Sequence, residues 1–215
     1  MDIQVLERLV KGRRSIRQWK KEDIPDELLR KAVELATWAP NGGNYQGWRF
    51  VIVKNKEVIG KMANAVQAAA DRIASWPEAT SWQEDVRHYQ KNSSYFRNAP
   101  VCIGVFISEY QSVMDKVLIA RESFDPEAKN ILGFRRSAPT SVQSAAAAVT
   151  TMLLVFHQMG LGAVWLGAPL MAKGDIEALL RVPANFSLTS LIAVGFPDES
   201  PQRERKPVDQ VLEFL

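Results

Sequence analysis

The sequence predicts an α+β protein arranged as a three-layer α-β-α domain. Short apolar runs typical of buried strands are interleaved with longer amphipathic patterns typical of helices, and the helices dominate. No regular series of strand, helix and strand is present, which argues against a Rossmann sheet. The 215 residues, of which 47% are apolar and 24% charged, fit a single globular domain over 1–215.

In the first half of the chain, helical spacing alternates with short apolar runs. Leu6, Leu9 and Val10 recur with helical spacing before a stop at Gly12, and Pro25 suits the first turn of a second helix. The predicted helices therefore cover 2–12, 25–40, 56–75 and, with a more polar pattern, 82–96, and the predicted strands cover 48–54 and 99–107.

A long apolar helix dominates the second half of the chain. It opens at Pro139 and ends at Gly160, and its small residues predict tight packing on all sides, with a partner subunit as a candidate neighbour. Residues 108–136 have a mixed pattern that predicts no definite element. The remaining predicted elements are a turn and strand over 160–167, a helix over 173–181 and a strand over 187–196.

Charge and cysteine content predict a cytoplasmic protein without nucleic-acid or membrane partners. The formal net charge of +3 is too mild to argue for nucleic acid. The single cysteine, Cys102, lies in an apolar run and is expected to be buried, without an intrachain disulfide or a zinc set. Charges interrupt the apolar pattern of 1–14, unlike in a signal peptide, and no uninterrupted run reaches the roughly 18 apolar residues that span a bilayer.

Basic residues gather near both ends of the sequence. The guanidinium fork of arginine matches phosphate oxygens in pairs, and a serine hydroxyl beside it would complete a phosphate cradle. The alternatives are a solvated basic turn and a charged tail. The first group is Arg13, Arg14, Ser15 and Arg17, and the second is Arg203, Arg205 and Lys206.

The loop between the second helix and the first strand is rich in glycine and amides. Asn44 and Gln46 each offer hydrogen-bond donors and acceptors, as the edge of a heterocycle requires. Gly42, Gly43 and Gly47 permit positive φ or close approach of the backbone to a flat ligand. The alternative is a plain turn that joins helix to strand.

A second glycine-rich segment, 160–169, follows the long helix. Gly162 and Gly167 flank an apolar strand, so a backbone with few obstructing side chains could lie along a ring. The alternative is a helix C-cap at Gly160 followed by a core strand.

Taken in order, these elements resemble the nitroreductase family of flavin mononucleotide (FMN) enzymes. The resemblance covers nearly the whole chain, except for about 75–137. The matching segments are RRSIRQW at 13–19, APNGGNYQGWRFVIV at 39–53, MGLGAVWLG at 159–167, SLIAVGFPDE at 190–199 and RERKP at 203–207.

The resemblance implies an α+β sandwich with a mostly antiparallel central sheet flanked by helices. It also implies an intertwined homodimer with FMN at the interface. The implied contacts with the FMN phosphate are Arg13, Arg14, Ser15, Arg203 and Arg205, and Arg17 is the implied charge stabiliser at the ring edge. The loop of either subunit would contribute Pro40, Asn41, Gly42, Asn44 and Gln46. The residues implied beside flavin N5 are Trp165, Leu166 and Gly167.

The chain departs from the family pattern within the loop. The family commonly has two serines after the proline, where this chain has Asn41 and Gly42. It commonly has a proline before the tryptophan, where this chain has Gly47. These changes predict a roomier or more flexible loop.

The function that the resemblance implies is NAD(P)H-dependent reduction of electron-poor acceptors such as nitroaromatics and quinones. Hydride would pass through flavin N5 in a ping-pong exchange without a catalytic side chain. Residues 76–136 are expected to form a variable substrate or lid region. Two alternatives remain: another flavin reaction (dehalogenation, flavin fragmentation or natural-product dehydrogenation), and a non-enzymatic module that binds anions or nucleic acid.

The sequence contains few candidate residues for acid–base catalysis or metal binding. His157 lies in the apolar helix and is expected to be a core or interface histidine, and His88 is expected at the surface. Two histidines and one cysteine at these spacings assemble neither a nucleophilic triad nor a metal site.

Overall fold

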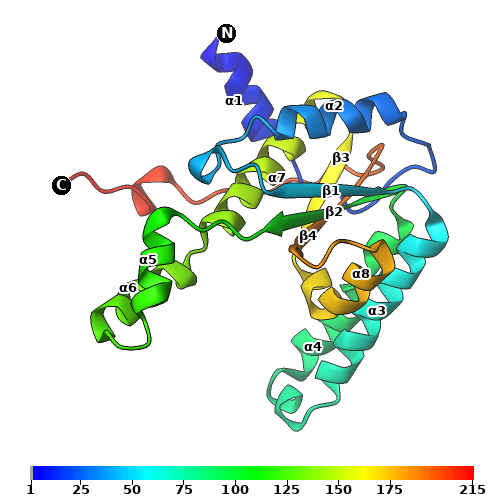
Figure 1. Cartoon of the computed structure of the whole chain (residues 1–215). Coiled ribbons are helices and arrows are strands. Elements are labelled where there is room, and N and C mark those ends of the chain that lie inside the picture. Colours follow the sequence, from blue (N-terminus) through cyan, green and yellow to red (C-terminus); the bar gives the residue numbers. More distant parts are fainter. Residues whose placement is uncertain (1) are drawn as a thin grey trace.

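The computed structural model describes residues 2–215 and has a four-stranded antiparallel sheet at its centre (Figure 1). The strand order is β1-β2-β4-β3, so β1 and β3 are the edges. The strands are β1 (Trp48–Val53), β2 (Val101–Ser108), β3 (Gly162–Leu166) and β4 (Phe186–Gly195). The sheet confirms the predicted fold class.

Strand β2 is buried on both of its faces. Cys102 and Phe106 belong to one core cluster, whereas Ile103 and Val105 belong to the cluster on the opposite face of the sheet. A strand that is covered on both sides reads as a continuous apolar run rather than an alternating one. Burial also raises the pKa of the Cys102 thiol to about 12, so this cysteine is an inert core residue.

Helices cover both faces of the sheet and make the three layers (Figure 1). On one face lie α2 (Asp26–Ala36) and α7 (Thr140–Gln158), which bury Leu29, Ala32, Val149 and Met152 among others. On the other face lie α3 (Lys56–Ala74) and α8 (Lys173–Leu180), which bury Ile59, Met62 and Ile176.

Most predicted helices form within a few residues of their expected bounds. Helix α1 spans Ile3–Gly12, and α4 spans Gln83–Asn92 between 3-10 turns. Pro25 occupies the N-cap position of α2 rather than its first turn. Gly160 ends α7 with a φ of 75°, as a C-capping glycine does.

Residues 109–139, here called the arm, project from the sandwich (Figure 1). The arm contains α5 (Val113–Arg121) and α6 (Pro126–Ser137), which contact each other. Arg135 forms an ion pair with Asp115, and its guanidinium holds the pKa of that carboxyl well below the usual range. The sequence pattern missed α5 because its apolar residues lie on all sides of the helix.

The helical stretch Pro126–Gln158 is long and apolar enough to cross a membrane by length and composition. This differs from the sequence expectation, which considered only uninterrupted apolar runs. Helix α7 within that stretch buries Val149, Met152 and Phe156 against the sheet. The core helix of a folded domain has the same composition.

Candidate functional site

Residues 13–20, here called the N-terminal strip, run along the edge strand β3. The backbone N–H of Ile16 donates to the carbonyl of Ala163 at 3.2 Å, and Ser15 and Ala163 form a parallel bridge. The indole N–H of Trp19 donates to the carbonyl of Gly162 at 2.8 Å. A Cβ at Gly162 would lie 2.7 Å from Ile16, so this glycine lets the strip lie close to the sheet.

A carboxylate holds the N-terminal strip from its other side. The side chain of Glu199 accepts the backbone N–H of Arg17 and, at 3.2 Å, that of Gln18. The backbone N–H of Asp198 donates to the carbonyl of Gln18 at 3.0 Å. The sequence gave no signal for this role of Glu199, because its partners are backbone groups.

Three arginines come together at the start of the N-terminal strip. The pKa of the Arg13 guanidinium is lowered by burial first and then by the charges of Arg205 and Arg14. Arg205 of the second basic group therefore lies near Arg13 of the first. Arg203 is exposed and does not contribute to this shift.

The cluster of Arg13, Arg14 and Arg205 has an unsatisfied donor. The Nε of Arg14 is buried and has no hydrogen-bond partner within residues 2–215. A buried charged donor without an acceptor is costly, and adjacent like charges add to that cost. A bound anion would satisfy both, so the geometry fits the predicted phosphate contact.

His157, at the end of α7, lies beside these arginines. Burial lowers the pKa of its imidazole, and the charges of Arg13 and Arg14 lower it further. A Cβ at Gly12 would lie 2.9 Å from His157 Nε2. A hollow of about 250 Å³ is lined by Gly12, Arg14 and His157 among others. The sequence placed this histidine in the core or an interface and missed its position at the arginine cluster.

The third predicted group lies further along the same sheet edge. From Ala163 to Gly167 strand β3 covers about 13 Å, at roughly 3.3 Å per residue. Trp165 is 42% exposed, whereas the Leu166 side chain is buried, so Leu166 can reach a ligand only through its backbone. Gly167 precedes the 3-10 turn Ala168–Ala172.

The amide-rich loop, 40–47, lies at the other end of α7. The backbone N–H of Gly42 donates to Ser144 Oγ at 3.2 Å. Gly43, Asn44 and Gln46 all have positive φ, at 59°, 51° and 52°. The Asn41 side chain accepts the backbone N–H of Gln46 at 2.9 Å. Pro40 and the side chains of Asn44 and Gln46 are exposed.

Helix α7 separates the predicted residues into two groups. Ser144 contacts the loop, and His157 lies at the arginine cluster, 13 residues further along the helix. At 1.5 Å per residue this separation is about 20 Å. One chain therefore does not bring the loop and the arginine cluster together.

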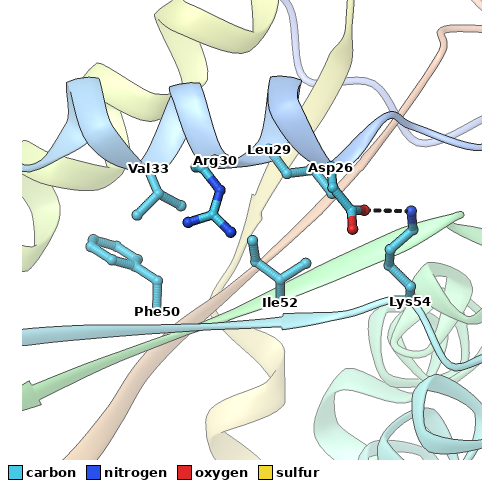
Figure 2. Close-up of a pocket in the computed structure, with 7 residues that line it drawn as sticks. All are labelled: Asp26, Leu29, Arg30, Val33, Phe50, Ile52 and Lys54. Atoms are coloured by element: carbon cyan, nitrogen blue, oxygen red, sulfur yellow. Dashed lines mark hydrogen bonds and ion pairs between the residues drawn. The ribbon is translucent and has the colours of Figure 1, made fainter.

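A further hollow, of about 450 Å³, lies at the opposite edge of the sheet (Figure 2). Val33 and Arg30 of α2 point toward Phe50 and Ile52 of β1, and Lys54 and Asp26 form an ion pair of 2.8 Å at its end. None of the predicted site residues lines this hollow. Within residues 2–215, β1 pairs only with β2, so its outer edge is open.

Metal-binding side chains do not cluster in the part of the chain that the structure describes. Over 2–215, no group of three or more His, Cys, Asp or Glu residues is placed to hold a metal ion.

Comparisons with known proteins place this arrangement in a family. A putative NADH dehydrogenase/NAD(P)H nitroreductase of Methanothermobacter thermautotrophicus is 28% identical over 89% of this chain and 77% of its own length. The structure of a BluB-like flavoprotein from Clostridium difficile 630 has a TM-score of 0.86 at 27% identity, covering 100% of this chain and 99% of that one.

An iodotyrosine deiodinase bound to FMN and 3-iodo-L-tyrosine has a TM-score of 0.70 at 25% identity, covering 94% of this chain and 95% of that one. Among curated relatives, the chain spans between 59% and 93% of their length. The model of the nitroreductase family matches residues 10–196. This match confirms the predicted resemblance: the chain belongs to the nitroreductase family.

Proposed function

We propose that this protein is an FMN-dependent oxidoreductase whose flavin lies at a homodimer interface. The observation that carries the proposal is the cluster of Arg13, Arg14 and Arg205 with the buried, unpartnered Nε of Arg14. Three guanidinium groups at one end of a glycine-lined strand edge suit a phosphate followed by a flat ring. FMN bound in a related structure supports the same cofactor here.

The chain's own residues bind and orient the cofactor in this proposal. Arg13, Arg14 and Arg205 hold the phosphate, and Ser15 adds a hydroxyl beside them. Arg17 supplies positive charge nearer the ring, where it would stabilise the anionic reduced state. The backbone at Leu166 and Gly167 faces the ring, and the half-exposed Trp165 excludes water. FMN, when bound, supplies hydride transfer through its N5.

Two chains are needed to complete this site in the proposal. The loop and the arginine cluster lie about 20 Å apart on one chain, so the loop of a partner would meet the cluster. The apolar side chains of Ile3, Leu6 and Val10 on α1 are exposed, as a subunit interface requires. The apolar side chains of Val211 and Phe214 near the C-terminus are exposed as well.

The proposed reaction is reduction of an electron-poor acceptor, such as a nitroaromatic or quinone, with NADH or NADPH as the donor. The likeness to a putative NAD(P)H nitroreductase supports this choice. Donor and acceptor would use the same flavin face in turn.

A second candidate is reductive dehalogenation of an aromatic compound. It is favoured by likeness across most of the chain to a deiodinase bound to FMN and 3-iodo-L-tyrosine. We also propose that the protein is cytoplasmic and has neither nucleic-acid nor membrane partners. The net charge of +3 and the single, buried Cys102 support this proposal.

The test is an anaerobic titration of the purified protein after addition of FMN. We expect a yellow protein whose flavin is bleached by NADH or NADPH and recovers its colour with a nitroarene or quinone. Bleaching by dithionite but by neither nicotinamide, with recovery on 3-iodotyrosine, would select dehalogenation. Failure to take up FMN at all would overturn both candidates.

A further inference from the structure

The loop 40–47 is held in place by residues at the two ends of the arm. Tyr110 lies where the chain enters the arm from β2, and Thr140 is the first residue of α7 after the arm. Both contact the loop, although about 30 residues separate them in sequence. Between them α5 and α6 extend away from the sandwich (Figure 1). The arm and the loop therefore share both of their points of attachment.

Thr140 occupies the space that a side chain at position 42 would need. A Cβ on Gly42 would lie far inside van der Waals contact of the Thr140 Cγ2 methyl, and 3.4 Å from the Tyr110 ring. The backbone of Gly42 is also fixed, because its N–H donates to Ser144 Oγ at 3.2 Å. The absence of a side chain at Gly42 is thus complementary to the methyl group of Thr140.

Tyrosines fill the space beside the other two glycines of the loop. A Cβ on Gly43 would clash with the Tyr110 hydroxyl, and the Tyr110 ring packs on Tyr45 with 5.4 Å between centroids. A Cβ on Gly47 would clash with the Tyr45 ring and would lie 2.6 Å from Ser108 Oγ. The space beside the glycines is therefore occupied by the chain itself, so the prediction of extra room is wrong, and the alternative of a more flexible loop stays a prediction.

The backbone of the loop needs such support. Asn44 and Gln46 have φ values of 51° and 52°. Asparagine adopts this left-handed conformation more readily than most residues, whereas for Gln46 it costs about 1–2 kcal/mol. Strained conformations persist only where the surroundings hold them. The Asn41 side chain holds the backbone of Gln46, and Tyr110, Thr140 and Ser144 hold the neighbouring residues Gly42, Gly43 and Tyr45.

We propose that Tyr110 and Thr140 are positioning residues that set the conformation of loop 40–47 and so couple the arm, where the acceptor is expected to bind, to the flavin. The inference rests on the proposed FMN site, because the loop is assigned there to the flavin. It gives the arm a second role besides contacting substrate: movement of either attachment point changes what the loop presents to the cofactor.

The test is a rescue experiment with Gly42→Ser. Serine at this position should collide with the Thr140 methyl, displace the loop and weaken FMN binding at least tenfold. Thr140→Ser removes that methyl and keeps the hydroxyl, so the double variant should recover to within about threefold of the parent. Gly60→Ser is the matched control, because nothing lies within 4 Å of a Cβ at Gly60.

A second measurement covers the case in which Gly42→Ser fails to fold. Hydrogen exchange of the arm should slow when FMN is added to the parent protein, and Tyr110→Ala should abolish that protection even at FMN concentrations that saturate its weakened site. An arm that shows the same protection in both proteins would overturn the coupling, as would Gly42→Ser with unchanged FMN affinity or without rescue by Thr140→Ser. A parent protein that binds no FMN would instead remove the proposed function.

Discussion

The two groups of predicted site residues, one at each end of α7, differ in kind. At its C-terminal end, Arg13, Arg14, Arg205 and His157 gather titratable groups around a buried donor without a partner. At its N-terminal end, loop 40–47 contains no charged residue and is defined by glycines, positive φ angles and two tyrosines. One end is suited to bind through charge and the other through backbone shape. Substitutions at the two ends should therefore weaken FMN binding in different ways.

The largest effect is expected at the charged end. Arg13→Ala and Arg205→Ala should each weaken FMN binding by about 1.5–3 kcal/mol, roughly tenfold to more than a hundredfold, because each removes a charged hydrogen bond to phosphate. Calorimetric titration with FMN measures the loss, and riboflavin, which lacks the phosphate, should bind all variants alike. Arg203→Ala is the matched control and should weaken FMN binding less, because Arg203 does not contribute to the lowered pKa of Arg13. Equal FMN affinity in all three variants and the parent would remove the phosphate assignment.

An intermediate effect is expected at the uncharged end. Gly43→Ala forces a side chain into a φ of 59° and against the Tyr110 hydroxyl, at a cost of about 1–2 kcal/mol. FMN affinity should fall about five- to thirtyfold, and riboflavin affinity should fall by the same factor, because no phosphate contact is involved. A loss confined to FMN would show that the two ends are not distinct. Gly60→Ala, in the open helical position, is the control and should bind normally.

The smallest effect is expected from the histidine at the charged end. The pKa of His157 is lowered from 6.5 by burial and by Arg13 and Arg14, so the unfolded chain takes up this proton at a higher pH than the folded protein does. Stability therefore falls as pH drops below about 6.5, and the effect vanishes above it. The unfolding temperature of His157→Gln should equal that of the parent at pH 8 and should exceed it at pH 5.5, by at most about 4 °C. Identical melting curves at both pH values would contradict this assignment.

The sequence predicted the charged end better than the uncharged one. The arginines and the strands are visible because charge and apolar runs are properties of single residues and short segments. Glu199 was missed because it binds backbone N–H groups, and Leu166 contributes no side chain because β3 turns it into the core. Tyr110 and Thr140 act through the space beside glycines far away in sequence, and no local pattern records such a contact.

The secondary-structure elements were likewise predicted where the sequence has a local pattern and missed where it has none. Strand β2 was predicted because burial on both faces makes it continuously apolar. Helix α5 was not, because its apolar residues lie on all sides and leave no helical period. Whether the match with the nitroreductase family extends to a shared site between two chains stays a prediction, since it depends on the contact between copies of this chain.

Mixed dimers test that prediction most directly. One chain would carry Arg13→Ala with Arg205→Ala, the other Gly42→Ser, with different affinity tags so that the heterodimer can be isolated. If each site combines the arginine cluster of one chain with the loop of the other, the heterodimer contains one intact site and should bind one FMN with parental affinity, although each homodimer binds poorly. A heterodimer that binds no better than the two homodimers would contradict the shared site.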